Sequence, residues 1–154
     1  MLKYDDYMVT FTEVPDECSL CFNITNCPCH CDKCFEPWLQ EDFGSELNIE
    51  VIKSVMAENK YCTCICFMGG DRDHVELGKI ITQCRKIWPD MKIAMYSGLP
   101  QMDNNLAKQL DYYKIGPFIP LFGPLNKKTS NQHFYKKENY KWVDITYRFY
   151  DKTE

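Results

Sequence analysis

The sequence predicts an α/β protein built around a parallel β-sheet. Its 154 residues fit a single domain, residues 1–154, that is long enough to bury a core without disulfide bonds. Hydrophobic residues make up 45% of the chain and charged residues 26%, which is typical of a folded globular protein. Apolar segments of strand length alternate with segments of helical periodicity, and this alternation favours right-handed βαβ units.

The first two expected strands flank a turn. Residues 7–14 and 18–24 are rich in β-branched and aromatic side chains, and Pro15-Asp16 separates them. The cysteine-rich segment 26–38 therefore begins where a strand ends.

A helix and a third strand are expected next. Residues 46–59 place apolar side chains at helical spacing, with Ser45 or Asn48 as the possible N-cap. Residues 61–68 form an apolar strand that two glycines terminate.

The same pattern continues toward the C-terminus. Residues 73–88 carry one apolar helical stripe before Pro89, and residues 91–98 form a further strand. A short helix near 103–110 and a strand near 111–115 follow.

The last forty residues are less regular. The stretch 117–126 is interrupted by prolines and is expected to be a surface loop, whereas the alternating segment 140–150 is expected to be a last strand.

Ligands of parallel sheets bind outside the carboxyl ends of the strands. Three loops should meet there: the cysteine-rich segment after 18–24, the turn Gly69-Gly70-Asp71, and Ser97-Gly98. We therefore expect one site built from all three loops.

Charge and hydropathy restrict the partners and the compartment. The net charge of -4 argues against nucleic-acid binding, and no apolar run is long enough for a membrane span. The N-terminus also lacks the apolar core of a signal peptide, so a cytoplasmic protein is expected. In a reducing compartment, ten cysteines indicate metal ligation or redox chemistry rather than disulfides.

Residues 26–38, NCPCHCDKCFEPW, place four cysteines within eight positions. Cys27, Cys31 and Cys34 have the spacing C-x3-C-x2-C, which can ligate three irons of a 4Fe-4S cluster and leave the fourth iron open. A closed zinc site is an alternative, because Cys29, or a Cys18-x2-Cys21 pair, could complete a set of four ligands. Spacing alone favours the cluster only modestly.

The turn Gly69-Gly70-Asp71 shifts the balance toward the cluster. Paired glycines permit close approach of the backbone to a ligand, and a carboxylate can hold an ammonium group. An open iron that binds the amino and carboxylate groups of S-adenosylmethionine can pass an electron to its sulfonium and release a 5'-deoxyadenosyl radical.

Other cysteines and histidines have simpler expected roles. Cys29 is expected to be a bystander in the loop, and His30 a solvated loop residue. Cys62, Cys64 and Cys66 alternate along a strand and are expected to be small buried side chains.

Together these motifs resemble radical S-adenosylmethionine enzymes and, more narrowly, the activating proteins of anaerobic (class III) ribonucleoside-triphosphate reductases. The chain departs from the narrower pattern at Asn26, where glycine is usual, and at Arg72, where proline is common. The matching motifs, in the family's order, are Cys27-x3-Cys31-x2-Cys34-Phe35 with Trp38, Gly69-Gly70-Asp71, Tyr96-Ser97-Gly98, Gly116-Pro117-Phe118-Ile119 and Ser130-Asn131-Gln132.

The resemblance implies an oxidoreductase that removes a hydrogen from a glycine of the reductase and leaves a glycyl radical. It implies an incomplete (β/α) barrel with an open parallel sheet, a 4Fe-4S cluster, S-adenosylmethionine and a low-potential electron donor. The cluster ligands would be Cys27, Cys31 and Cys34. The residues expected at the cofactor are Lys33, Cys34, Phe35, Gly69, Gly70, Asp71 and Ser97, with the ammonium group on Asp71.

Two alternatives stay open at this stage. One is a small radical enzyme acting on a small molecule, similar to the carboxydeazaguanine synthases. The other is a non-enzymatic module that uses its cysteines to bind zinc.

Overall fold

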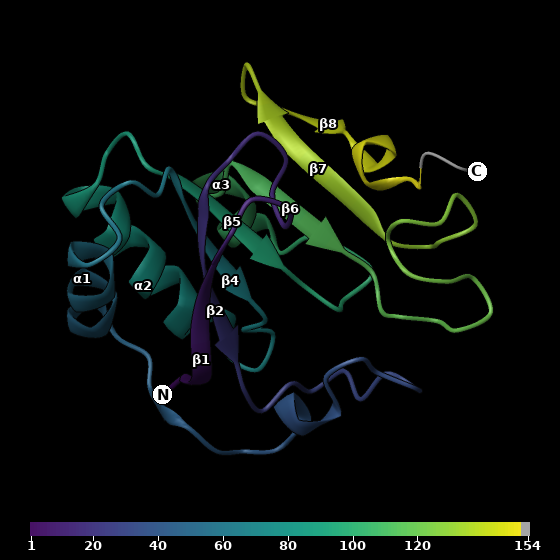
Figure 1. Ribbon diagram of the computed structural model, residues 1–154, viewed down its shortest axis with the longest axis horizontal. Coiled ribbons are helices and arrows are strands. Elements are labelled where there is room, and N and C mark those ends of the chain that lie inside the picture. Colours follow the sequence, from purple (N-terminus) through teal and green to yellow (C-terminus); the bar gives the residue numbers. More distant parts are fainter. Residues whose placement is uncertain (152–154) are drawn as a thin grey trace.

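The computed structural model describes residues 1–151 and contains one eight-stranded sheet, in the order β3-β1-β2-β4-β5-β6-β7-β8 (Figure 1). The strands are β1 (Lys3–Thr10), β2 (Ser19–Ile24), β3 (Ser45–Glu46), β4 (Cys64–Met68), β5 (Lys92–Tyr96), β6 (Tyr112–Ile115), β7 (His133–Glu138) and β8 (Lys141–Asp144). The helices are α1 (Ile49–Ala57), α2 (His74–Ile87) and α3 (Asn104–Gln109), with 3-10 turns η1 (Pro37–Gln40) and η2 (Thr146–Phe149). Within the described chain, no helix has the length and hydropathy needed to cross a membrane.

The centre of the sheet is parallel. β2, β4, β5 and β6 pair in parallel, while β1 joins β2 and β7 joins β6 in antiparallel fashion. The carboxyl ends of the four parallel strands therefore lie at one edge, as the alternation of strands and helices predicts. The assignment to the incomplete (β/α) barrels stays a prediction.

Local signals account for the helices. The side chain of Asn48 accepts a hydrogen bond from the backbone of Val51, so Asn48 caps α1, whereas Ser45 lies in β3. The Asp73 side chain caps α2 in the same way, by accepting from the backbone of Glu76, and the helix ends before Pro89.

Two strand predictions were wrong in position or extent, and another strand was not predicted. The first strand is β1, which starts at Lys3 and ends at Thr10 instead of spanning 7–14. In the segment 140–150 the strand covers only β8, and η2 follows it. β7 was not predicted, because HFYKKE is polar except for Phe134 and Tyr135 and becomes a strand by pairing with β6.

The two faces of the sheet have different cores. α1, α2 and α3 pack on one face, over a cluster that includes Phe22, Phe67 and Met95. The other face carries small side chains in β2, β4 and β5, namely Cys21, Cys66 and Ala94, and large rings in β6 and β7, namely Tyr112 and Phe134. Cys64 lies on the same face as Cys21 and Cys66 and is buried as expected. Cys62 is also buried, but it precedes β4 and packs in the cluster under the helices.

Replacing Phe67 with Ala should lower the free energy of unfolding by about 3–5 kcal/mol, because the ring is fully buried and stacks 6.5 Å from the ring of Phe22. The matched control is Tyr61→Ala, since Tyr61 is exposed and its loss should change stability by less than about 0.5 kcal/mol. Denaturant unfolding of the two variants measures the difference. Equal effects would contradict this account of the core.

Candidate metal centre and adjoining cavity

The carboxylate of Asp71 joins the three loops that the sequence predicts to meet. Oδ1 accepts a hydrogen bond from Ser97 Oγ at 2.8 Å, and Oδ2 accepts one from Gly98 N at 2.8 Å. The thiol of Cys29 approaches Oδ2 at 3.8 Å from the cysteine-rich loop. The convergence expected at the carboxyl ends of the strands is therefore present.

Two glycines shape the turn before Asp71. Gly69 and Gly70 have φ angles of 120° and 106°, in the region that favours glycine. A Cβ on Gly70 would lie 2.7 Å from Cδ2 of Leu77. The backbone N–H of Gly69 donates to the carbonyl of Tyr96 at 3.0 Å, so this turn is tied to the end of β5.

His74 adds a further contact that the sequence did not reveal. Its Nε2 lies 2.9 Å from Asp71 Oδ1, and its Nδ1 lies 3.1 Å from Asp103 Oδ2. Burial alone would lower the pKa of His74, but its hydrogen bonds to the two carboxylates raise it above the usual value. The Asp71 side chain is only 2% exposed, so its predicted contact with a cofactor ammonium stays a prediction and would need one of these partners to move.

The cysteine-rich loop is fixed at its beginning. The backbone N–H groups of Asn26 and Cys27 donate to the carbonyls of Glu41 and Leu39, each at 2.9 Å. Between these anchors and η1 the chain has no regular structure, and Asn26, His30 and Lys33 have positive φ angles. Non-glycine residues in this conformation cluster at ligand sites.

All four thiols of this loop are free and partly exposed. The neighbouring Cys29 side chain lowers the pKa of Cys27 to about 6, which favours the thiolate form that metals bind. Among residues 1–151, no three His, Cys, Asp or Glu side chains are already arranged around a metal position. The donor set fits a thiolate-bound cluster, and the irregular loop would close around it.

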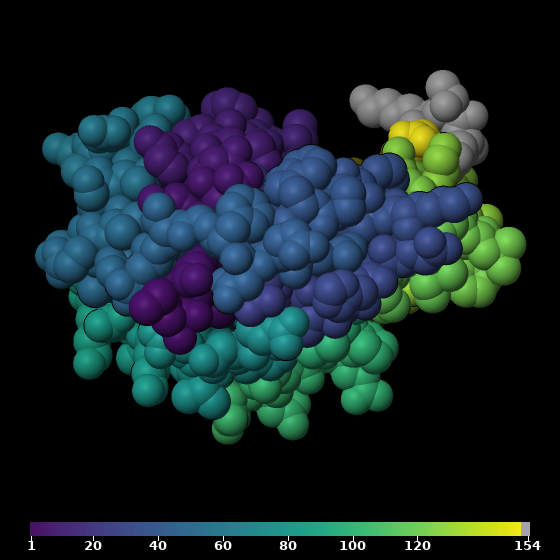
Figure 2. Space-filling view, turned by 90° about the horizontal axis from the view of Figure 1, so that it is seen from below, coloured from purple at the N-terminus to yellow at the C-terminus, as the bar shows by residue number. Residues whose placement is uncertain are grey.

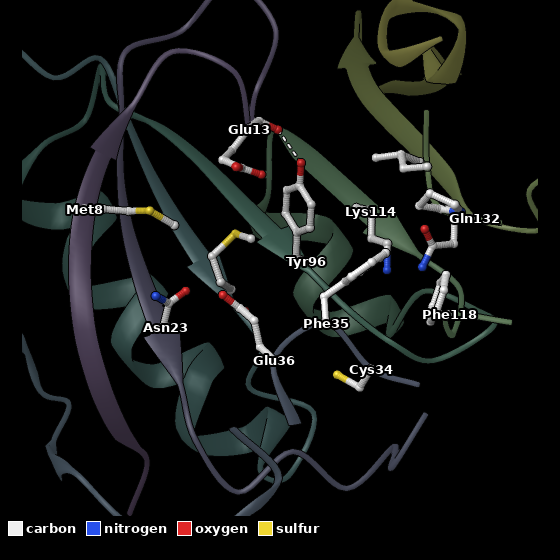
Figure 3. Close-up of a pocket in the computed structure, with 13 residues that line it drawn as sticks. Met8, Glu13, Asn23, Cys34, Phe35, Glu36, Tyr96, Lys114, Phe118 and Gln132 are labelled. Carbon is white, nitrogen blue, oxygen red and sulfur yellow. Dashed lines mark hydrogen bonds between the residues drawn. The ribbon is translucent and has the colours of Figure 1, made fainter. Parts of the chain in front are cut away.

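A cavity of about 440 Å³ adjoins the loop on the helix-free face of the sheet (Figure 3). Asn23, Met68, Tyr96 and Lys114 line it from the ends of β2, β4, β5 and β6. They share one face because each lies two residues beyond a buried residue of that face, such as Cys66 before Met68. The strand alternation therefore places four side chains in one cavity.

Aromatic rings border the cavity opposite the sheet. Phe35, next to Cys34, packs against Phe118 with 4.8 Å between ring centroids, and both rings line the cavity. Glu13 and Glu36 also line the cavity, and burial raises the pKa of both carboxyl groups. Seen from below, the cysteine-rich loop crosses this end of the molecule toward the segment after β6 (Figure 2).

Two distant motifs also meet beside the cavity. The side chain of Asn131 donates to the carbonyl of Pro117 at 3.0 Å, and that of Gln132 donates to the carbonyl of Gly116 at 3.4 Å. A Cβ on Gly116 would lie 3.1 Å from the Cα of Gln132. Glycine is therefore required where these segments cross.

The structure separates the predicted site residues into two groups. Cys34 and Phe35 line the cavity, whereas Gly69, Gly70, Asp71 and Ser97 do not. Lys33 is exposed in the loop, and Cys27 and Cys31 are partly exposed.

Sequence reasoning missed Lys114, Asn23 and Glu13. A lysine inside the apolar strand YYKI is the one signal that could have indicated a buried charge.

Comparison with known families assigns the iron–sulfur class. Residues 15–141 match the family described as a 4Fe-4S single cluster domain, and the chain belongs to this family. No curated protein and no solved structure matched the chain significantly. The family match supports iron–sulfur binding, which the cysteine spacing favoured over zinc.

The raised pKa of His74 predicts a pH dependence of stability. Because the folded-state pKa lies above the unfolded value, the stabilisation is present below the usual histidine pKa and is lost as pH rises through the folded value. Relative to a His74→Asn variant, the wild type should therefore be more stabilised at about pH 5.5 than at about pH 8.5.

Denaturant unfolding at the two pH values measures this difference. His133→Asn is the matched control, because its contact with Asp144 is exposed on both sides and should contribute less. An equal pH dependence in wild type and His74→Asn would rule out the proposed linkage.

Proposed function

We propose that this protein is an activating enzyme that uses S-adenosylmethionine to install a glycyl radical in an anaerobic ribonucleoside-triphosphate reductase. Its family supplies the 4Fe-4S cluster. The observation that carries the proposal is the meeting of the cysteine-rich loop, the Gly69-Gly70-Asp71 turn and Ser97-Gly98 around one carboxylate. These are the motifs through which the sequence resembles such activating enzymes.

In this proposal Cys27, Cys31 and Cys34 hold three irons of the cluster. Their partly exposed thiols lie in the loop that follows β2 and need no rearrangement of the sheet to reach a ligand. When bound, the cluster and S-adenosylmethionine supply the electron transfer that breaks a carbon–sulfur bond and yields the 5'-deoxyadenosyl radical.

The other predicted residues would orient the methionine end of the cofactor. Gly69 and Gly70 present backbone without side chains, and Ser97 and Asp71 fix the position of that backbone through their hydrogen bond. Phe35 would cover the cofactor from the loop, as its place on the cavity wall allows.

The cavity would receive the reacting glycine of the partner. Phe35 and Phe118 form an apolar rim, and excluding water there protects a radical from side reactions. The substrate is then a protein segment, and a low-potential donor supplies the electron.

The cavity itself favours the second candidate, a small radical enzyme. A volume of about 440 Å³ with Glu13, Asn23 and Lys114 on its walls suits a small polar molecule. The proposed chemistry at the cluster is the same, and only the substrate differs.

Replacing Cys31 with Ala should reduce the iron content from about four per chain to less than one, because one of three ligands is lost. Release of 5'-deoxyadenosine from S-adenosylmethionine should fall to background. Iron analysis and chromatography of the anaerobically prepared protein measure the two quantities. Cys84→Ala is the matched control, since Cys84 is buried in α2 and should leave both unchanged. Retained cleavage in Cys31→Ala would contradict the proposed ligands.

Incubation of the reduced, cluster-loaded protein with S-adenosylmethionine and an anaerobic reductase should produce a glycine-centred doublet in electron paramagnetic resonance. The Cys31→Ala protein should give no doublet under the same conditions. Cleavage of S-adenosylmethionine without a doublet would reject the activating function and favour the small-molecule enzyme.

A further inference from the structure

Lys114 is a buried lysine at the end of β6, and only 9% of it is exposed. Its Nζ donates hydrogen bonds to the carbonyls of Ser97 at 3.1 Å and Gly116 at 2.8 Å. An ammonium group has three N–H donors, so these carbonyls use two of them. Nζ lies on the cavity wall, near the side-chain amide of Gln132 (Figure 3).

Lys114 lines the same cavity as Cys34, an expected cluster ligand, and the carboxyl groups of Glu13 and Glu36 line it as well. Burial lowers the pKa of Lys114 to about 8, while Cys31, Asp71, Cys29 and Cys27 act in the opposite direction. The carbonyls of Ser97 and Gly116 carry no net charge. A buried cation is costly unless an anion compensates it, and Asp71 is already hydrogen-bonded to four other groups.

A cluster held by the cysteine-rich loop would add negative charge on the Cys34 side of this cavity. Three thiolate ligands would give the bound cluster a net negative charge. Reduction of the cluster by a low-potential one-electron donor adds one further negative charge and makes or breaks no bond. Coulomb attraction in a site of low dielectric is strong, so a fixed cation nearby favours the reduced form.

We propose that the Lys114 ammonium is the counter-charge of the cluster and raises its reduction potential. Lys114 is a positioning residue in this role: it ligates no iron, and it acts through the electrostatic field at the cluster. The inference rests on the part of the proposed function that places the cluster on Cys27, Cys31 and Cys34, and it does not depend on the substrate.

The test compares Lys114→Met, which removes the charge, with Lys114→Arg, which keeps it. Cluster-loaded proteins are prepared anaerobically, and a redox titration followed by electron paramagnetic resonance gives the midpoint potential. Lys114→Met should shift the potential to a more negative value at unchanged iron content, and Lys114→Arg should stay near wild type. Lys92→Met is the matched control, because Lys92 is exposed at the opposite end of the neighbouring strand, β5, and should not shift the potential.

A Lys114→Met protein with full iron content and the wild-type potential would overturn the inference. If the methionine variant does not fold, Lys114→Gln decides, since it is neutral but retains a donor for the two carbonyls. A shifted potential in a protein that does not cleave S-adenosylmethionine would support the counter-charge and reject the proposed function, so the two failures are distinguishable.

Discussion

The buried carboxylate of Asp71 is the constraint on which the site depends. A carboxylate removed from water must be satisfied by donors, and here they come from three places in the chain: Ser97 and Gly98 after β5, His74 at the start of α2, and Cys29 in the cysteine-rich loop. Because the donors occupy both oxygens, they fix the loops relative to one another. The sheet brings the carboxyl ends of the strands together, and the hydrogen bonds to the Asp71 carboxylate hold the loops that follow them in contact.

Much of the framework follows from the sequence. The apolar helical stripe before Pro89 predicted α2, and the short apolar segments predicted β4, β5 and β6 with nearly the observed bounds. These strands are buried on both faces, so their sequences are strongly hydrophobic. Edge strands carry a weaker signal. β7 has one fully buried apolar side chain, Phe134, among mostly polar residues, and it forms by pairing with the edge of β6, which no local pattern records.

The site was predictable in outline only. The order of strands and loops placed the three motifs at one edge, since parallel strands end together. The contacts of His74 with Asp71 and Asp103 could not be foreseen, because they join residues up to 29 positions apart through the packing of α2 and α3. The burial of Lys114 likewise depends on segments 97–98 and 116–132 closing over the end of β6.

The cysteine-rich loop lies outside the hydrogen-bond ladder of the sheet and is held at its start by Asn26 and Cys27. None of the expected ligands Cys27, Cys31 and Cys34 lies in a paired strand. Binding of a metal group by these thiols would therefore leave every strand pairing in place. Destruction of that group by oxygen would leave an intact apoprotein, which can be repaired by reinsertion and need not be synthesised again.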